Sequence, residues 1–194
     1  MTRARPSVRP SSCADPAAPL ATVESPSTDR PIVSSAHLVS EKSPELSEFE
    51  FGLIIAAHAF NRWLIRCMGA AGVKDMTPTD VLVLHHINHR RTPKRLSDIA
   101  FVLNIEDAHV VSYSVRKLQG MGLVAGTKRG KEMFYATTDA GHALCLRYRA
   151  VREACLMPGF SGEAEENRRL AEVARTLRQI SGRYDQAARA ATAY

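Results

Sequence analysis

The stretch that decides the fold is LSDIAFVLNIEDAHVVSYSVRKLQGMGLV, residues 96–124. It predicts a short apolar helix, a tight break and a second helix that ends at Gly120–Gly122. Val111, Val115 and Leu118 recur at helical spacing, so the second helix has one apolar face that packs on a core. Two short helices joined by a tight break are typical of a helix-turn-helix.

The other face of the second helix carries polar groups at helical spacing. His109, Ser112, Tyr113 and Arg116 recur at i, i+3, i+4 and i+7, and Lys117 follows them. Hydroxyl groups bind base edges or phosphates, and arginine is the usual reader of guanine in the DNA major groove. We therefore expect these residues to contact DNA, although an ordinary solvated helix face has similar side chains.

Composition and charge limit the class of protein. The chain has 194 residues and a formal net charge of +6, which permits a nucleic-acid or anionic-membrane partner. It has no run of eighteen apolar residues and no apolar signal core at its start, which favours a cytoplasmic location. The four cysteines have no CxxC spacing, so the sequence supports neither a disulfide scaffold nor a zinc ribbon.

The first 44 residues differ from the rest of the chain. Pro, Ser, Ala and Thr dominate residues 1–44, aromatic residues are absent, and no helical or strand period persists. This composition predicts a disordered tail. Arg3, Arg5 and Arg9 are available for loose phosphate contact, but an inert solvated tail is the more economical interpretation.

Residues 45–194 predict one folded domain. A long helix over 45–72 has an apolar seam, and Thr77-Pro78-Thr79-Asp80 is a typical helix start. Two short strands, 123–126 and 133–137, flank a basic turn at 127–132. Helices are expected over the following ranges: 78–89, 140–156 and 161–190. The fold class is therefore mainly α, a winged helix-turn-helix with a small two-stranded wing over 77–137, flanked by long helices.

Two further groups of cations accompany this pattern. The loop before the helix-turn-helix and the tip of the wing are both basic, and both are candidates for contact with DNA phosphates. The residues are Arg90, Arg91, Lys94 and Arg95 in the loop and Lys128, Arg129 and Lys131 in the wing. A solubilising loop and a solvated hairpin tip are the alternatives.

Three motifs in this order resemble the MarR family of bacterial winged-helix regulators. They are LSDIAFVLNI, VRKLQGMGLV and YATTDAGHAL, and the resemblance extends from about Glu45 to Leu156. It implies a sequence-specific transcription regulator that binds a palindromic DNA site as a homodimer. It also implies that helices 45–72 and 140–190 form the dimer. The expected dimer contacts are Phe49, Leu53, Phe60, Trp63, Leu170, Leu177 and Ile180.

The chain departs from the family pattern at two places. The wing reads Lys128-Arg129-Gly130-Lys131 and lacks the usual Asp-x-Arg, which leaves Arg129 as the candidate for the minor groove. The break Asn104–Asp107 is one residue longer than usual and acidic. Its carboxylates would repel phosphates unless Asp107 serves as a helix N-cap.

Other functions find less support in the sequence. His85 and His89 lie one turn apart beside His86, but no nearby Cys or His completes a zinc site, so we predict neither a metal nor a cofactor. No phosphate loop, GxSxG or HExxH motif indicates an enzyme.

Three alternatives remain open beside DNA binding by the homodimer. A winged helix can act as a protein–protein interaction module, and Glu106 and Asp107 are compatible with that reading. The same fold can serve a redox- or metal-linked sensor, for which Cys67, Cys145 and Cys155 are the candidate thiols. Many MarR-type relatives respond to a small ligand, so the resemblance also leaves room for a small-molecule effector.

Overall fold

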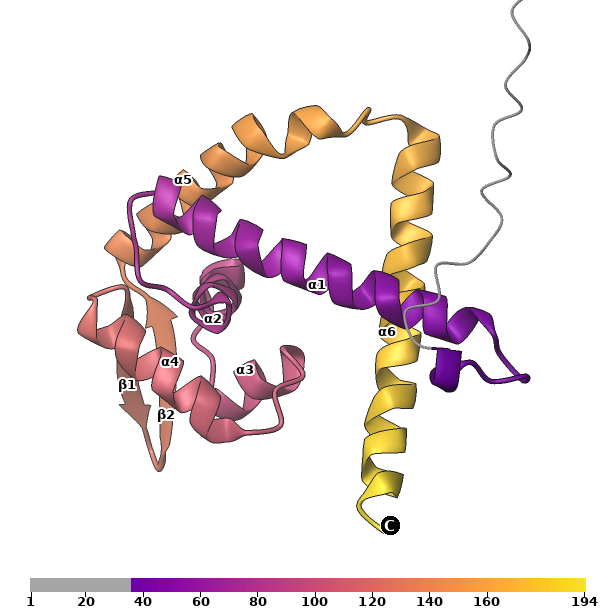
Figure 1. The fold of residues 1–194 in the computed structure, drawn as a ribbon. Helices are drawn as coiled ribbons and strands as arrows, with labels where there is room; N and C mark the ends of the chain where they lie inside the picture. Colours follow the sequence, from indigo (N-terminus) through magenta and orange to yellow (C-terminus); the bar gives the residue numbers. More distant parts are fainter. Residues whose placement is uncertain (1–35) are drawn as a thin grey trace, which may run out of the picture. The chain divides into compact units, whose positions relative to one another are not determined.

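The computed structural model describes residues 36–194, and the first 35 residues of the predicted tail lie outside the described part (Figure 1). The chain divides into two compact units between Gly52 and Leu53. The described part of the first unit contains a short 3₁₀ helix, Ala36–Leu38, and the start of α1. The second unit contains the rest. The helices are α1 (Glu45–Ala70), α2 (Pro78–Asn88), α3 (Leu96–Val102), α4 (Ala108–Gly120), α5 (Asp139–Cys155) and α6 (Ala164–Ala191).

The start of α2 confirms the predicted cap. Thr77 Oγ1 accepts a hydrogen bond from the Asp80 backbone N–H at 3.2 Å, and the Thr77 N–H donates to Asp80 Oδ2 at 2.8 Å. This reciprocal capping box satisfies two backbone donors, and Pro78 occupies the first turn, where its missing N–H costs nothing.

The helix-turn-helix consists of α3 and α4 and confirms the expectation from residues 96–124. The turn between them requires a left-handed backbone at Asn104, whose φ is +52°. Asparagine tolerates this conformation better than most residues other than glycine. The side chains that pack α4 on the core are at most 1% exposed, as their spacing predicted; they are Val111, Val115 and Leu118.

The wing is an antiparallel hairpin of β1 (Val124–Arg129) and β2 (Glu132–Thr137). The strands are longer than the sequence predicted, because pairing continues to Arg129 and Glu132. The loop is therefore only two residues long, and Gly130 supplies the positive φ of +63° at its first position. Lys94 pairs its backbone with Tyr135 beside the hairpin, at 2.8 and 2.9 Å.

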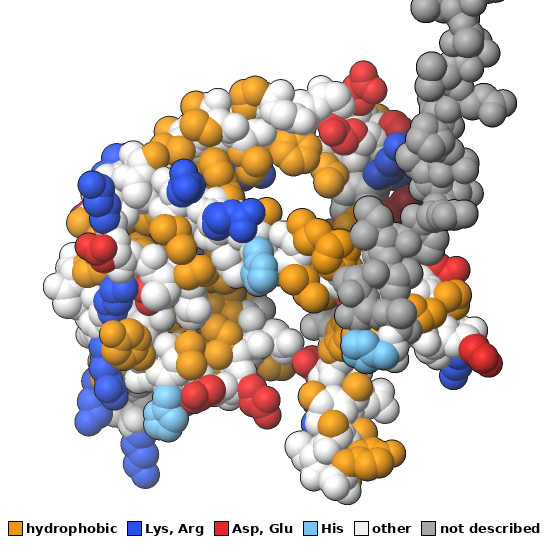
Figure 2. All heavy atoms as spheres, viewed as in Figure 1, with side chains coloured by type: hydrophobic (Ala, Val, Ile, Leu, Met, Phe, Trp, Pro, Cys, Tyr) orange, Lys and Arg blue, Asp and Glu red, His pale blue; other side chains and the backbone are white. Residues whose placement is uncertain are grey.

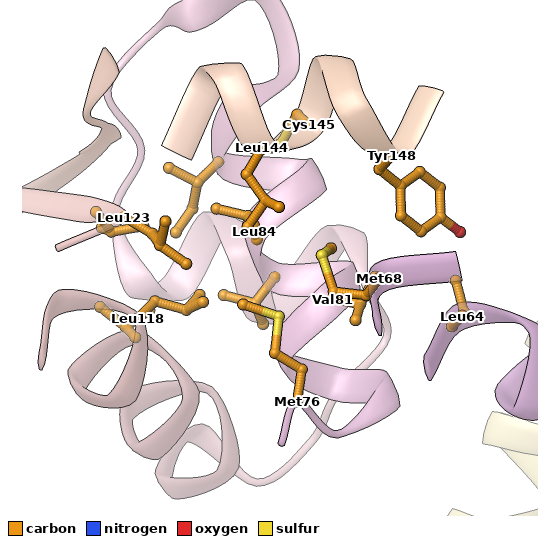
Figure 3. Packing of buried hydrophobic residues seen from close by; sticks show 14 of the residues in the cluster. Leu64, Met68, Met76, Val81, Leu84, Leu118, Leu123, Leu144, Cys145 and Tyr148 are labelled. Carbon is orange, nitrogen blue, oxygen red and sulfur yellow. The ribbon is translucent and has the colours of Figure 1, made fainter. Parts of the chain in front are cut away.

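One hydrophobic core joins the second half of α1 to the winged helix. Figure 3 shows Leu64 and Met68 of α1, Val81 and Leu84 of α2 and Leu118 of α4 pointing into a common interior. Side chains of α5 close the same cluster. The apolar seam expected along α1 is thus buried only in part: Cys67 is 1% exposed, whereas Phe60 is 52% exposed.

The junction between the wing and α5 has no spare room. Thr138 caps α5 by accepting from the Gly141 N–H at 3.1 Å, and its hydroxyl donates to the Gly122 carbonyl at 2.7 Å. A Cβ atom at Gly141 would lie 2.0 Å from the Leu123 carbonyl oxygen. Only glycine fits this contact between α5 and the backbone before β1.

The last helix, α6, contributes no buried residue. It begins at Ala164 rather than near Ser161, because the Glu166 carboxylate accepts hydrogen bonds from the backbone N–H groups of Ser161 and Gly162 and holds that segment as a turn. No helix in the described part of the chain is long and apolar enough to cross a membrane.

Candidate nucleic-acid interface

The recognition-helix candidate, α4, presents one continuous exposed face. His109, Tyr113 and Arg116 are exposed on it, and Ser112 is half-buried at its edge. Tyr113 is 68% exposed, so its hydroxyl is available to a partner. The structure therefore brings three of the four predicted side chains together and leaves Ser112 at the margin.

The acidic start of α4 is partly neutralised as a cap. Asp107 Oδ1 accepts a hydrogen bond from the His109 backbone N–H at 2.8 Å. A carboxylate at this position is stabilised by the helix N-terminus, so it competes less with approaching phosphates. Glu106 remains exposed beside it.

Lys117, which the sequence analysis placed among the DNA contacts, is engaged within the chain in this structure. Its ammonium donates to Asp80 Oδ2 at 2.7 Å and to the Asp75 carbonyl oxygen, so it points at the start of α2. The Asp80 side chain is 1% exposed, and its other oxygen accepts a 2.7 Å hydrogen bond from Ser114 Oγ. Lys117 therefore anchors α4 to α2 and is not on the exposed face.

The cause of this arrangement lies in the charge of Asp80. Burial alone would raise the pKa of its carboxyl group. The hydrogen bonds donated by Lys117, Ser114 and Thr77 lower it by more, so the pKa lies below its ordinary value. The buried Asp80 carboxylate therefore joins the N-terminus of α2 to Ser114 and Lys117 of α4.

Two of the four loop cations, Lys94 and Arg95, are also engaged within the chain. The Lys94 ammonium donates to the carbonyl oxygens of His89 at 2.6 Å and Thr92 at 3.0 Å, and burial lowers its pKa. The Arg95 guanidinium makes a two-point contact with Asp98, at 3.0 and 3.1 Å, and a third bond with Glu132 of the wing. Both cations hold the loop and the hairpin in place. Neither is free for a phosphate in the described structure.

The other two loop cations remain accessible. Arg90 and Arg91 are exposed, with positive φ angles of 58° and 51°. Arg91 lies 3.4 Å from Asp139, and both side chains are more than half exposed, so this ion pair contributes little.

The wing carries the densest positive charge near α4. Lys128, Arg129 and Lys131 are all exposed, and Figure 2 shows blue side chains gathered along the edge where the hairpin and α4 lie. The Arg129 guanidinium sits 5.3 Å from the centre of the Phe134 ring, a cation–π contact that limits its rotation. The predicted wing cations are therefore positioned on the same edge as the polar face of α4.

A cleft of about 610 Å³ lies between α1, α2 and α5. Its wall combines aromatic side chains, two arginines and His85, which stacks edge-on against Tyr148 at 4.4 Å. His85 Nε2 is buried and has no hydrogen-bond partner within the described residues, and burial lowers the pKa of its ring. This cleft could not be predicted from local sequence patterns, because its lining comes from three distant segments.

Two of the cysteines, Cys67 and Cys145, are buried and lack the features of reactive thiols. Burial raises the pKa of Cys67, and it raises that of Cys145 to about 11. A raised pKa lowers the thiolate fraction and with it the reactivity. Cys155 is exposed, and Cys13 lies outside the described residues. Within residues 36–194, no three His, Cys, Asp or Glu side chains are grouped to hold a metal ion.

Comparisons with known proteins agree with this architecture. Residues 76–141 match the sequence family described as the winged helix DNA-binding domain. No curated protein sequence is significantly similar to the chain.

Solved structures extend the likeness to the long helices. AbfR of Staphylococcus epidermidis has a TM-score of 0.61 at 17% identity, over 74% of this chain and 95% of that one. CouR from Rhodococcus jostii RHA1 has 0.56 at 18%, over 68% and 90%. NMB1585, a MarR family regulator from Neisseria meningitidis, has 0.57 at 14%, over 72% and 94%. The chain therefore has the winged helix-turn-helix fold of MarR regulators, which confirms the predicted fold.

Proposed function

We propose that this chain is a MarR-type transcription regulator that binds double-stranded DNA as a homodimer on a palindromic site. The observation that carries the proposal is the joint exposure of the α4 polar face and the wing cations on one edge of the winged helix. Reduced AbfR, which has this fold, has been solved bound to DNA.

In this proposal, α4 enters the major groove and the wing follows the backbone. His109, Tyr113 and Arg116 contact base edges, and Ser112 contacts a base or a phosphate at the margin. The phosphate contacts come from Arg90 and Arg91 in the loop and from Lys128, Arg129 and Lys131 in the wing. Lys94, Arg95 and Lys117 support this surface from behind, so their removal acts through structure.

The long helices support the dimer part of the proposal. In the second unit Leu53, Phe60, Leu170 and Leu177 are each more than a third exposed, although their spacing is that of buried helix faces. A second copy of the chain would cover them, with Trp63 and Ile180 at the margins of the same faces. Phe49, in the first unit, is proposed as a further contact.

The cleft between α1, α2 and α5 favours a small-molecule effector as an additional partner. CouR, which shares the fold, has been solved with p-coumaroyl-CoA. In this chain Arg149 and Arg152 offer positive charge, and the unpaired His85 Nε2 offers an acceptor for a hydroxyl group. We propose an anionic ligand with an apolar planar body.

Selection of bound duplexes from a random DNA library tests the main proposal. The expected result is a palindromic consensus with half-sites about one helical turn apart. Affinity for the selected duplex is then measured from about 50 to 200 mM salt, and it should fall steeply because phosphate contacts release counterions.

A protein–protein interaction module gives a different outcome. In that case the library yields no consensus, and any binding to DNA is weak. A consensus without symmetry would contradict the homodimer but leave DNA binding in place.

A further inference from the structure

The exposed face of α4 contains an apolar side chain that the core does not use. Val110 is 41% exposed, whereas its neighbour Val111 is fully buried. Val110 does not belong to the buried cluster or to the apolar residues packed against it. It lies one turn before Tyr113 on the helix surface, at a spacing that lets the two side chains meet.

The position of Val110 in the helix narrows what it can contact. It is the third residue of α4, directly after the cap at Asp107 and His109. In helix-turn-helix proteins the N-terminal residues of the second helix approach the base edges. An exposed side chain in the first turn of α4 therefore lies at the end of the helix that approaches the base edges.

The major groove offers this side chain one apolar partner. Every base pair presents hydrogen-bond donors and acceptors there, and thymine alone adds a methyl group at C5. We infer that Val110 packs against a thymine methyl group and makes each half-site selective for a T·A pair at that position. The inference rests on the proposed DNA-binding function and adds a named base to it.

The surroundings of Val110 agree with this contact. Beside the capped Asp107, the exposed Glu106 places negative charge at the start of the helix, which disfavours a phosphate there. The same charge does not oppose an uncharged methyl group. The nearest exposed cation on α4, Arg116, lies nearly two turns later. The first turn is thus suited to reading a base and poorly suited to holding the backbone.

Deoxyuridine tests the inference, because it removes the thymine methyl group and keeps every hydrogen-bonding group. The probe is the consensus duplex selected by the full-length protein from a random library, with deoxyuridine replacing one thymine in each half-site at a time. We expect one symmetric pair of positions at which affinity falls about fourfold per half-site, which is the effect of one buried methyl group. Changing both half-sites lowers it about sixteenfold.

The variant Val110→Ala links this effect to the side chain. It should bind the thymine and deoxyuridine duplexes almost equally at that position. Val102→Ala removes the same two methyl groups from a side chain that is 60% exposed on α3, and it should keep the selectivity of the unchanged protein. Circular dichroism checks that both variants keep their helices.

Two results overturn the inference. If no thymine is sensitive to loss of its methyl group, or if Val110→Ala keeps the same selectivity, Val110 does not read thymine, although duplex binding and the proposed function stand. If the library yields no bound duplex, the proposed function fails and the inference fails with it.

Discussion

The helices α2 and α6 differ in how many of their residues are buried by the rest of this chain. α2 has 11 residues and buries five of them, including a charged one. α6 has 28 residues and buries none, although its apolar side chains recur at helical spacing. Contacts within the chain are thus sufficient to bury the apolar residues of the winged helix. The long C-terminal helix has apolar side chains at helical spacing and buries none of them within this chain.

The largest effect is expected at the tightest point of the winged helix. Gly141→Ala places a methyl group 2.0 Å from the Leu123 carbonyl oxygen, so α5 and the wing must separate. We expect a loss of about 3 kcal/mol or more in the free energy of unfolding, measured by urea titration.

The matched control is Gly182→Ala in α6, where a Cβ atom meets nothing within 4 Å. Since alanine is the better helix former, this variant should be more stable by about 0.5–1 kcal/mol. Equal changes in the free energy of unfolding at Gly141 and Gly182 would contradict the expected difference in packing between the two regions.

The next effect concerns the buried ion pair between α2 and α4. Asp80→Asn leaves Lys117 without its carboxylate, and Lys117→Met leaves Asp80 buried without its cation. Each variant should lose about 3 kcal/mol of stability, and the double variant should lose less than the sum. Additive losses in this cycle would mean that the two side chains do not act as a pair.

The pair also predicts a pH dependence. The pKa of Asp80 is lower in the folded state than in the unfolded state, so its contribution is complete above about pH 4 and is lost as the pH falls through the folded value. The stability difference between the unchanged protein and Asp80→Asn should therefore shrink below pH 4. A constant difference down to pH 2 would argue against this assignment.

A third prediction concerns the proposed dimer face of α6 and distinguishes it from the winged helix. Leu170→Glu together with Leu177→Glu places two charges on the apolar face of α6, so we expect a monomer by light scattering. Affinity for the palindromic duplex should fall about 100-fold or more, because the second half-site is no longer tethered. The unfolding of the winged helix should change little.

Gln179→Glu with Gln186→Glu adds the same charge to the opposite face of α6 and serves as the control. This variant should remain dimeric and bind as before. A dimeric Leu170→Glu, Leu177→Glu protein would show that the exposed apolar face has another purpose.

The smallest effect lies on the proposed DNA surface. Arg116→Ala should weaken binding to the selected duplex by about 1–3 kcal/mol and relax the preference at one base pair. Lys131→Ala should weaken all duplexes alike and lower the salt slope by about one. Unchanged affinity of Arg116→Ala would remove this residue from the base contacts.

Local signals in the sequence were sufficient for most of the fold. The cap at Thr77 and the apolar face of α4 depend on residues at most seven apart, and both were predicted correctly. The hairpin was also predicted, but its strands were placed too short because Thr127 and Lys128 resemble turn residues. The pairing across the strands decides that question, and it is not local.

The candidate site was harder to predict because its cations look alike in the sequence. Lys117 is separated from Asp80 by 37 residues, and Arg95 is separated from Glu132 by the same number. No spacing rule indicates that these two cations are paired while Arg116 and Lys128 remain exposed. Val110 was missed for a related reason: it stands next to Val111 and adds to the apolar count, although it lies on another face.

The contact at Gly141 bears on how the resemblance to regulators should be understood. Gly141 lies within the motif YATTDAGHAL, one of three that carried the resemblance. A carbonyl oxygen 2.0 Å from the place of a Cβ atom closes this position to the other nineteen amino acids for as long as the wing meets α5 in this way. The constraint on this glycine comes from packing within the fold and does not depend on which DNA sequence the proposed surface would read. The motif identifies the scaffold, and the exposed side chains of α4 must identify the target.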